Sequence, residues 1–369
     1  MDKKRSKVAG TRRRCRPLRR EQAGGLWFVT LRVTDSCFWL HPMLSSGLQP
    51  VNRKARRLCE SFKARAEREV KKLVTEANSR MGAFQAKLTV ETAKVLLRDL
   101  VGSCLARAQQ HCRAQGTGEV ELFAFVAMSN HVHLVLRTQG KNLSQFMRYF
   151  SSTLASGINY LTGRRGQLLG RRYDAQPILD DGAACDRVAY AVDNPRAAGL
   201  VEHHEQWPGQ LLCFGMGPTD TLRFTFFNRL AWHRANRPKD VTKFFEPAEL
   251  TLSPLPHLSE LERDAYRKTV ESWLEELQNE AKREKPTDDR RAVRHVAEVI
   301  RVPVGHRPAR SKHKRRPYAF GSKRKLREHR RAMGEVIALH QVASDRWRQR
   351  KPDATFPEGT YAPPITIAA

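Results

Sequence analysis

Two short strand-like runs joined by a tight turn constrain the fold of this chain most strongly. Glu121–Ala127 and His131–Arg137 are rich in aromatic, aliphatic and β-branched residues, and Ser129 and Asn130 between them favour a turn. The pair therefore predicts a β-hairpin. Leu26–Val33, which follows two glycines, has the same composition and predicts a further strand.

Three stretches with apolar residues at three- and four-residue steps predict helices that cover a sheet. They are Ala93–Ala108, Leu143–Leu161 and a shorter helix from about Ala183 to Asp193. We expect the second to end at Gly163–Gly166, and the third to end at Asn194 because a residue before proline avoids helical geometry. Leu168–Leu179, between the last two, reads as extended.

Charge is the main compositional signal. The 369 residues include 67 Lys and Arg against 38 Asp and Glu, a formal net charge of +29, which indicates a polyanionic partner. Residues 301–351 alone hold 17 basic and 3 acidic side chains, so about half of the net charge lies there. The apolar runs are far shorter than the roughly 20 residues of a membrane span. Seven scattered cysteines without a CxxC pair predict reduced thiols, and we expect a cytoplasmic protein without membrane contact.

These shifts in composition divide the chain into four predicted parts. They are a basic N-terminal arm (1–20), a domain that holds the strands and helices (21–214) with a charged helical insertion at about 46–82, a helical extension (215–300), and a basic DNA-binding or disordered tail (301–369).

Two histidines on the second strand of the hairpin are the first candidate for chemistry. Side chains alternate between the faces of a strand, so His131 and His133 project from one side while Val132 and Leu134 project from the other. Two imidazoles can bind a divalent metal, but the site is incomplete without a third ligand. Taken alone, the pair fits two packing or surface histidines better than a metal site, because short motifs often match by chance.

A tyrosine and an asparagine lie four residues apart on the third predicted helix. Tyr190 and Asn194 share one helix face, and Val188 and Ala191 lie on another face that can pack on a sheet. A phenol beside an amide oxygen suits attack on a phosphodiester next to a metal that the amide helps to bind. The alternatives are a half-buried core tyrosine and an asparagine that caps the helix.

The two motifs together resemble those of a known family. Met128–Leu136 (MSNHVHLVL), followed about 60 residues later by Tyr190–Val201 (YAVDNPRAAGLV), is similar to the single-tyrosine HUH transposases, and in particular to the REP-associated tyrosine transposases. Gly25–Thr30 (GLWFVT) and Gly163–Tyr173 (GRRGQLLGRRY) fit the same order and spacing. The resemblance covers roughly residues 20–214.

The resemblance implies a ferredoxin- or RRM-like α+β domain, an antiparallel β-sheet flanked by helices, here with a basic, partly helical C-terminal extension. It implies that His131, His133 and Asn194 bind Mg²⁺ or Mn²⁺ and that Tyr190 is the nucleophile. The implied enzyme is a transposase-like, metal-dependent single-stranded DNA endonuclease and strand transferase. It would act on hairpin-associated sites through a 5′-phosphotyrosine intermediate that leaves a free 3′-OH.

Several alternatives stay open at this stage. Tyr149, Tyr160 and Tyr173 compete with Tyr190 as nucleophile, although none of them has an asparagine one helical turn later. A DNA hairpin-binding or regulatory protein could keep the fold without cutting. A metal phosphodiesterase with an activated water would need further ligands, for which Asp180 and Asp181 are candidates, although the start of a helix explains both more simply. A homodimer is also left open.

Basic and aromatic side chains near these motifs are candidates for contact with single-stranded or hairpin DNA. They are Arg148, Arg171, Arg172, Tyr173, Arg187, Arg315, Arg316, Lys323, Arg324 and Lys325.

Overall fold

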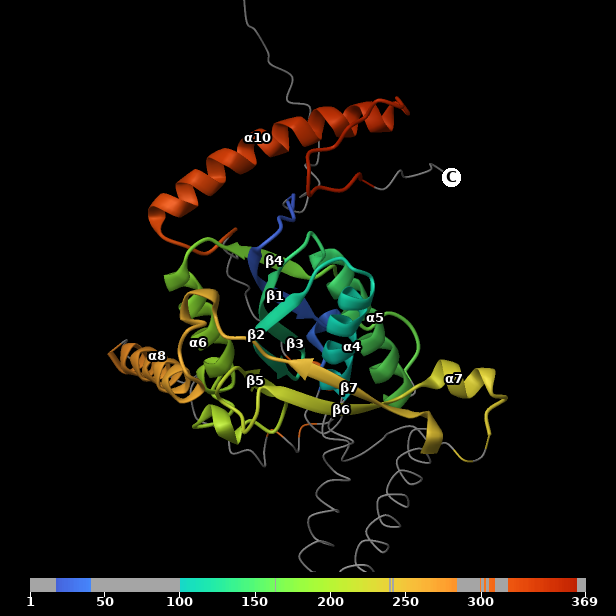
Figure 1. The fold of residues 1–369 in the computed structure, drawn as a ribbon, viewed down its shortest axis with the longest axis vertical. Helices are drawn as coiled ribbons and strands as arrows, with labels where there is room; N and C mark the ends of the chain where they lie inside the picture. Colours follow the sequence, from blue (N-terminus) through green and yellow to red (C-terminus); the bar gives the residue numbers. More distant parts are fainter. Residues whose placement is uncertain are drawn as a thin grey trace, which may run out of the picture. The chain divides into compact units, whose positions relative to one another are not determined.

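The computed structural model describes residues 18–40, 100–162, 164–238, 240, 242–283, 299, 302, 305–308 and 318–363 (Figure 1). These residues form two compact units, one between Gln22 and Arg327 and the other made of Leu18–Glu21 and Glu328–Pro363. The predicted insertion at 46–82, residues 1–17 of the predicted arm, and the candidates Arg315 and Arg316 lie outside the described residues.

A five-stranded antiparallel sheet forms the centre of the larger unit, with strand order β4-β1-β3-β2-β5. Its strands are β1 (Gly25–Arg32), β2 (Val120–Met128), β3 (His131–Thr138), β4 (Asp174–Ile178) and β5 (Leu211–Cys213). β2 and β3 are joined by Ser129 and Asn130 alone, with Met128 opposite His131. The predicted hairpin is confirmed, and it supplies two of the sheet's inner strands.

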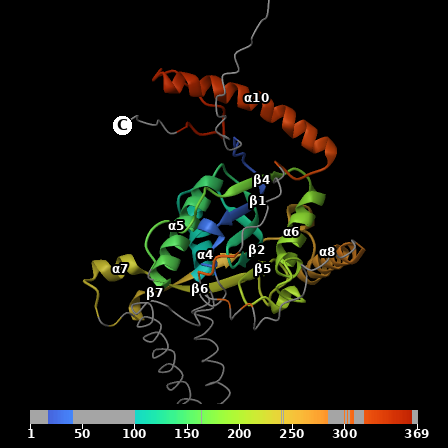
Figure 2. The same cartoon turned by 180° about the vertical axis from the view of Figure 1, so that it is seen from behind.

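Helices cover both faces of this sheet (Figures 1 and 2). The main ones are α4 (Leu100–Ala114), α5 (Leu143–Thr162) and α6 (Asp181–Ala197). One apolar core joins α4 and α5 to side chains such as Val29 and Leu134, and a second core joins α6 to Phe28 and Val135 on the opposite face. The order β1-α4-β2-β3-α5-β4 and the antiparallel pairing are those of a ferredoxin-like fold. The predicted α+β fold, an antiparallel sheet flanked by helices, is confirmed.

The third helix is longer than the sequence predicts. α6 does not end at Asn194 but continues through Pro195 to Ala197. Proline cannot donate the hydrogen bond to the carbonyl four residues earlier, but the helix has only two more residues after it, so little of the helix depends on that bond. The chain leaves helical geometry at Gly199, which has a φ of +68°, and the amide of Leu200 donates to the carbonyl of Pro195 at 3.1 Å.

Beyond residue 214 the chain is not the purely helical extension that we expected. β6 (Thr221–Phe227) and β7 (Phe245–Thr251) form an antiparallel hairpin on either side of the short helix α7 (Arg229–Arg234). Phe224 and Leu250 of this hairpin are buried in the same core as α4. A long helix is also present in this stretch, α8 (Arg263–Arg283), which contacts α6.

The second unit contains most of α10 (Lys323–Arg348) and the segment that follows it. Trp347 Nε1 donates to the carbonyl of Pro363 at 3.1 Å, and the hydroxyl of Tyr361 donates to Glu21 at 3.2 Å. Within this unit, the segment after α10 is therefore bonded both to that helix and to the N-terminal residues. None of the helices in the described ranges is both long and apolar enough to span a membrane.

Candidate functional site

The two histidines of β3 lie on the α6 side of the sheet. Their ring centroids are 4.8 Å apart and the ring planes are nearly perpendicular, at 80°. Antiparallel pairing places Thr30 opposite His133 and Arg32 opposite His131, so these two β1 side chains share the histidine face. This face also includes Phe28, whose ring stacks on His133 at 4.9 Å.

Hydrogen bonds fix the orientation of both imidazoles. Thr30 Oγ1 lies 3.0 Å from Nδ1 of the buried His133, and Asn130 Oδ1 accepts from Nδ1 of His131 at 2.6 Å. When a histidine is bonded through Nδ1, its Nε2 is the nitrogen that faces a ligand. Thr30 and Asn130 are thus positioning residues, which the sequence reading did not identify. Asn130 is part of the turn, and Thr30 is an isolated hydroxyl in an otherwise apolar strand.

Tyr190 lies against this histidine face. Its ring centroid is 5.7 Å from that of His133 and 5.8 Å from that of Phe28, in both cases edge to face. The side chain keeps 38% of its surface exposed, so a large substrate can reach the phenol. Tyr190 on α6 and the two histidines on β3 therefore lie side by side on this face of the sheet.

The local sequence of α6 explains how Tyr190 reaches this position. Asp180 caps the helix by accepting from the amide of Ala183 at 3.0 Å, and it also accepts from the amide of Ser322 at 2.6 Å. These amides, that of Ser322 above all, lower the pKa of Asp180. Val188 and its apolar neighbours bury the opposite helix face in the second core. Asp180 therefore acts as a helix cap, which agrees with the simpler of its two sequence interpretations.

Asn194 lies one helical turn after Tyr190 and is buried, with 8% of its surface exposed. Its side-chain amide makes no hydrogen bond among the described residues, and its backbone carbonyl accepts from Ala198 at 3.0 Å. Asn194 is therefore an interior residue of α6 and does not cap the end of the helix.

Two arginines lie beside the tyrosine. The guanidinium of Arg187 lies 5.0 Å from the ring centroid of Tyr190 and 4.3 Å from that of Phe320. Arg32 approaches from β1, and the charges of both arginines interact with Tyr190. Burial lowers the pKa of Arg32 and of Arg187 below the ordinary value. Arg187 is one of the predicted DNA contacts, whereas Arg32 is not, because only the strand register places it opposite His131.

The competing tyrosines lie elsewhere. Tyr149 stacks on His111 at 4.5 Å and packs against the core of α4 and α5. Tyr173 is buried in that core, on the sheet face opposite the histidines. The ring of Tyr160, also on α5, lies 4.8 Å from the guanidinium of Arg229. Among the described residues, Tyr190 is the tyrosine with a ring contact to His133.

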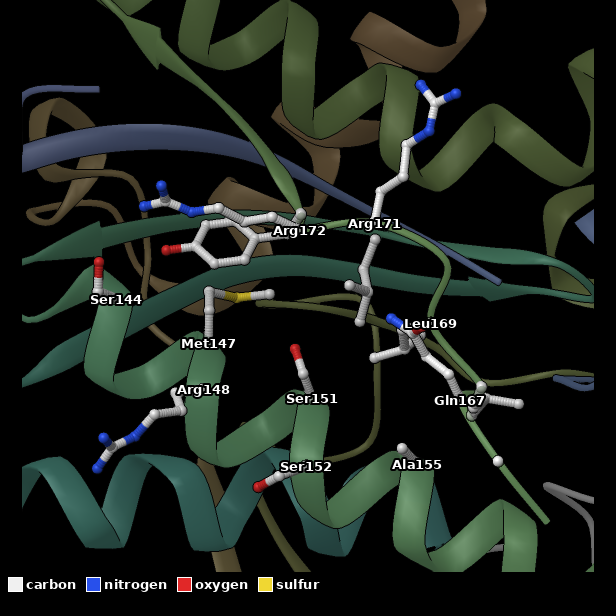
Figure 3. Close-up of a pocket in the computed structure, with 14 residues that line it drawn as sticks. Ser144, Met147, Arg148, Ser151, Ser152, Ala155, Gln167, Leu169, Arg171 and Arg172 are labelled. Carbon is white, nitrogen blue, oxygen red and sulfur yellow. The ribbon is translucent and has the colours of Figure 1, made fainter. Parts of the chain in front are cut away.

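Most of the remaining DNA-binding candidates are not near Tyr190. Arg148, Arg171, Arg172 and Tyr173 line a hollow of about 530 Å³ between α5 and the segment before β4. In Figure 3, Ser144, Met147 and Ser151 project from α5 toward the segment that holds Leu169. This hollow borders the α5 face of the sheet, so these four candidates lie on a different surface from Arg187 and Tyr190. Lys323, Arg324 and Lys325 form the first turn of α10, where Lys325 interacts with the charge of Asp180.

No cluster of three His, Cys, Asp or Glu side chains suited to a metal is found within the described ranges. A metal site here would consist of His131, His133 and an amide oxygen, which is a partial set of ligands.

Comparisons with known proteins give little further support. No family model and no curated protein matches the chain. Among solved structures, the fold is similar to that of a REP-associated tyrosine transposase bound to a REP hairpin, with a TM-score of 0.31 and 15% sequence identity. The match covers 53% of this chain and 81% of the other.

Proposed function

We propose that this protein is a transposase-like strand transferase that cuts and rejoins single-stranded DNA at hairpin-associated sites, with Tyr190 as the nucleophile. The observation that supports it most is the contact between the rings of Tyr190 and His133, 5.7 Å apart and next to His131. A partly exposed phenol beside two oriented imidazoles has no evident structural purpose, whereas a nucleophile beside a metal-binding pair has a chemical one.

The reaction consists of two transesterifications. In the first, Tyr190 Oη attacks the phosphorus, the P–O3′ bond breaks, the phenol loses its proton, and the released O3′ gains one. The product is a 5′-phosphotyrosine and a free 3′-OH. In the second, the 3′-OH of another strand attacks the same phosphorus, the P–O bond to Tyr190 breaks, and the phenol regains its proton. No external energy source is needed because each ester replaces another of similar energy.

The residues present fit a divalent cation that the DNA helps to bind. Nε2 of His131 and of His133, with the amide oxygen of Asn194, would hold Mg²⁺ or Mn²⁺, and phosphate oxygens and water would complete the coordination. The hydrogen bonds of the two Nδ1 atoms to Thr30 Oγ1 and Asn130 Oδ1 support this set, because ligating histidines commonly have such partners. Such a cation polarises the phosphoryl oxygen and positions the leaving oxygen.

A labelling experiment tests both the nucleophile and the polarity. Wild-type protein and the Tyr190→Phe variant are incubated with hairpin DNA that has a single-stranded flank, labelled at either end, with Mn²⁺ or Mg²⁺. We expect 3′-labelled DNA to become attached to wild-type protein on a denaturing gel and 5′-labelled DNA to appear as a shorter free strand. Tyr190→Phe should give neither product, and Tyr149→Phe is the matched control that should give both.

The outcome also decides between the proposed enzyme and a hairpin-binding protein that does not cut. Salt-sensitive binding without an adduct, over many hairpins and both metals, would favour the binding protein. An adduct that persists in Tyr190→Phe would reject Tyr190 as the nucleophile.

A further inference from the structure

The partly buried guanidiniums of Arg187 and Arg32 lower the stability of the free protein. The Nε atom of each is buried and has no hydrogen-bond partner within the part of the chain that the structure describes. Neither guanidinium forms an ion pair with a carboxylate there. A guanidinium that loses water without gaining a hydrogen-bonded anion destabilises the folded state.

Aromatic rings keep Arg187 in place without using its N–H groups. Its guanidinium lies 4.3 Å from the centroid of Phe320, 5.0 Å from that of Tyr190 and 5.8 Å from that of Phe28. Contact with ring faces leaves the donors at the guanidinium edge available to an incoming acceptor. Tyr190 follows Arg187 by three residues on α6, so the two side chains are neighbours on the helix surface.

Arg32 lies on the same face of the sheet as His133, whose ring contacts Tyr190. It is paired with His131 across β1 and β3, and its charge interacts with Tyr190. The phenol thus has one partly desolvated guanidinium on its own helix and another on the sheet. Burial also lowers the pKa of both arginines, and for Arg187 this effect exceeds that of the nearby charge of Asp186.

We infer that Arg32 and Arg187 together form an anion site that binds one phosphodiester group of the DNA against Tyr190. This inference rests on the proposed function for the identity of the phosphate as the one that is cut. The two guanidiniums would bind its non-bridging oxygens, a geometry that their planar donor sets favour.

Binding measurements without cleavage test this site. In the Tyr190→Phe background, which cannot form an adduct, Arg32→Met and Arg187→Met are compared for binding of a fluorescent hairpin DNA with a single-stranded flank, over a range of salt concentrations. Arg223→Met is the matched control, because it removes the same charge from an exposed arginine on β6. We expect each site variant to lose about 10- to 100-fold in affinity. The slope of log K against log salt should fall by about 0.7.

A neutral methylphosphonate, placed at each linkage in turn, then locates the phosphate. If both arginines bind one group, a single position should weaken binding to Tyr190→Phe. The same position should have no effect in the variant that also lacks both arginines. A profile unchanged by loss of the arginines, or losses equal to those of Arg223→Met, would overturn the inference.

Thermal unfolding separates this role from a structural one. Neither guanidinium is paired with a carboxylate among the described residues, and a methionine can keep apolar contact with the rings around Arg187. Arg32→Met and Arg187→Met should therefore leave the Tm of the free protein unchanged or raise it. Loss of binding together with a clear fall in Tm would assign a structural role and overturn the inference. If phosphate binding depends on the arginines but no Tyr190 adduct forms, strand transfer is rejected and the anion site is retained. If cleavage does not depend on the arginines, the anion site is rejected and strand transfer is retained. If the protein does not bind DNA at low salt, the anion site and strand transfer are both rejected.

Discussion

Thr30 orients the buried histidine of the candidate site through one hydrogen bond, and its replacement by valine tests that arrangement. Valine has nearly the same shape as threonine and also favours a strand, so it removes the hydroxyl and little else. Thr30 and His133 each have 4% of their surface exposed, and Thr30 Oγ1 lies 3.0 Å from His133 Nδ1. In Thr30→Val, Nδ1 loses this partner at a site where water has little access.

The expected loss of stability follows from the burial of Thr30 and His133 and from the hydrogen bond between them. A neutral hydrogen bond contributes about 0.5–1.5 kcal/mol, and a buried group left without a partner costs about 1–3 kcal/mol. Allowing for the apolar gain from the new methyl group, we expect the free energy of unfolding of Thr30→Val to fall by about 1–2 kcal/mol. For a unit of this size, that corresponds to a fall in Tm of about 2–5 °C.

The assay is thermal and urea unfolding, with Thr225→Val as control. Thr225 lies on β6 and its side chain makes no hydrogen bond among the described residues, so the control should change stability by no more than about 0.5 kcal/mol. In the strand-transfer assay, a His133 without this hydrogen bond is less firmly oriented, so the Mn²⁺ concentration needed for half-maximal activity should rise by about 10- to 100-fold. If the Thr30→Val variant has the same unfolding free energy and the same Mn²⁺ dependence as the Thr225→Val variant, Thr30 does not orient His133.

Three further changes test the packing around the site. Gly102→Ala would place a Cβ 2.4 Å from the ring of Phe224, so we expect a loss of about 1–3 kcal/mol in urea unfolding. Asp180→Ala removes the oxygen that accepts from the amide of Ala183, and the loss of this helix cap should cost about 1–2 kcal/mol. Burial lowers the pKa of His204 below 6.5, so the unfolded chain takes up a proton more readily than the folded chain. The free energy of unfolding should therefore fall as the pH drops below 6.5. His204→Gln should flatten this pH dependence, measured by urea unfolding between pH 7.5 and 5.

Each of these expectations can fail in a definite way. Gly182, near the start of α6, has open space where a Cβ would be added, so Gly182→Ala should be tolerated. If Gly102→Ala is tolerated equally well, the β6–β7 hairpin does not pack on α4 as described. An Asp180→Ala variant as stable as the wild type would mean that other groups cap α6. A pH dependence that is identical with and without His204 would assign the acid sensitivity to other groups.

Local patterns in the sequence were enough to predict most of the larger unit. The hairpin followed from two strand-like runs on either side of Ser129 and Asn130, and α5 from its apolar spacing. The placement of Tyr190 followed from the helical interval that it shares with Asn194 and from the family resemblance. These features depend on residues close together in the chain, where periodicity is informative.

The features that were missed depend on contacts between distant residues. Pro195 was expected to end α6, but a proline in the last turn costs the helix little. The contact of Phe320 with Arg187 joins segments more than 100 residues apart, and nothing near Phe320 in the sequence indicates it. Arg32 became a site residue only once the register placed it opposite His131. The β6–β7 hairpin was overlooked because a short alternating run followed by charged residues gave a weak signal.

Identification of the amino acid joined to DNA is the most direct test of the central claim. Trypsin cleavage after Arg187 and Arg196 releases Val188–Arg196, in which Tyr190 is the only tyrosine, while Tyr149, Tyr160 and Tyr173 fall in other peptides. After reaction with hairpin DNA and nuclease trimming, mass spectrometry should find the nucleotide mass on Val188–Arg196. The same mass on a peptide that contains one of the other three tyrosines would contradict the account.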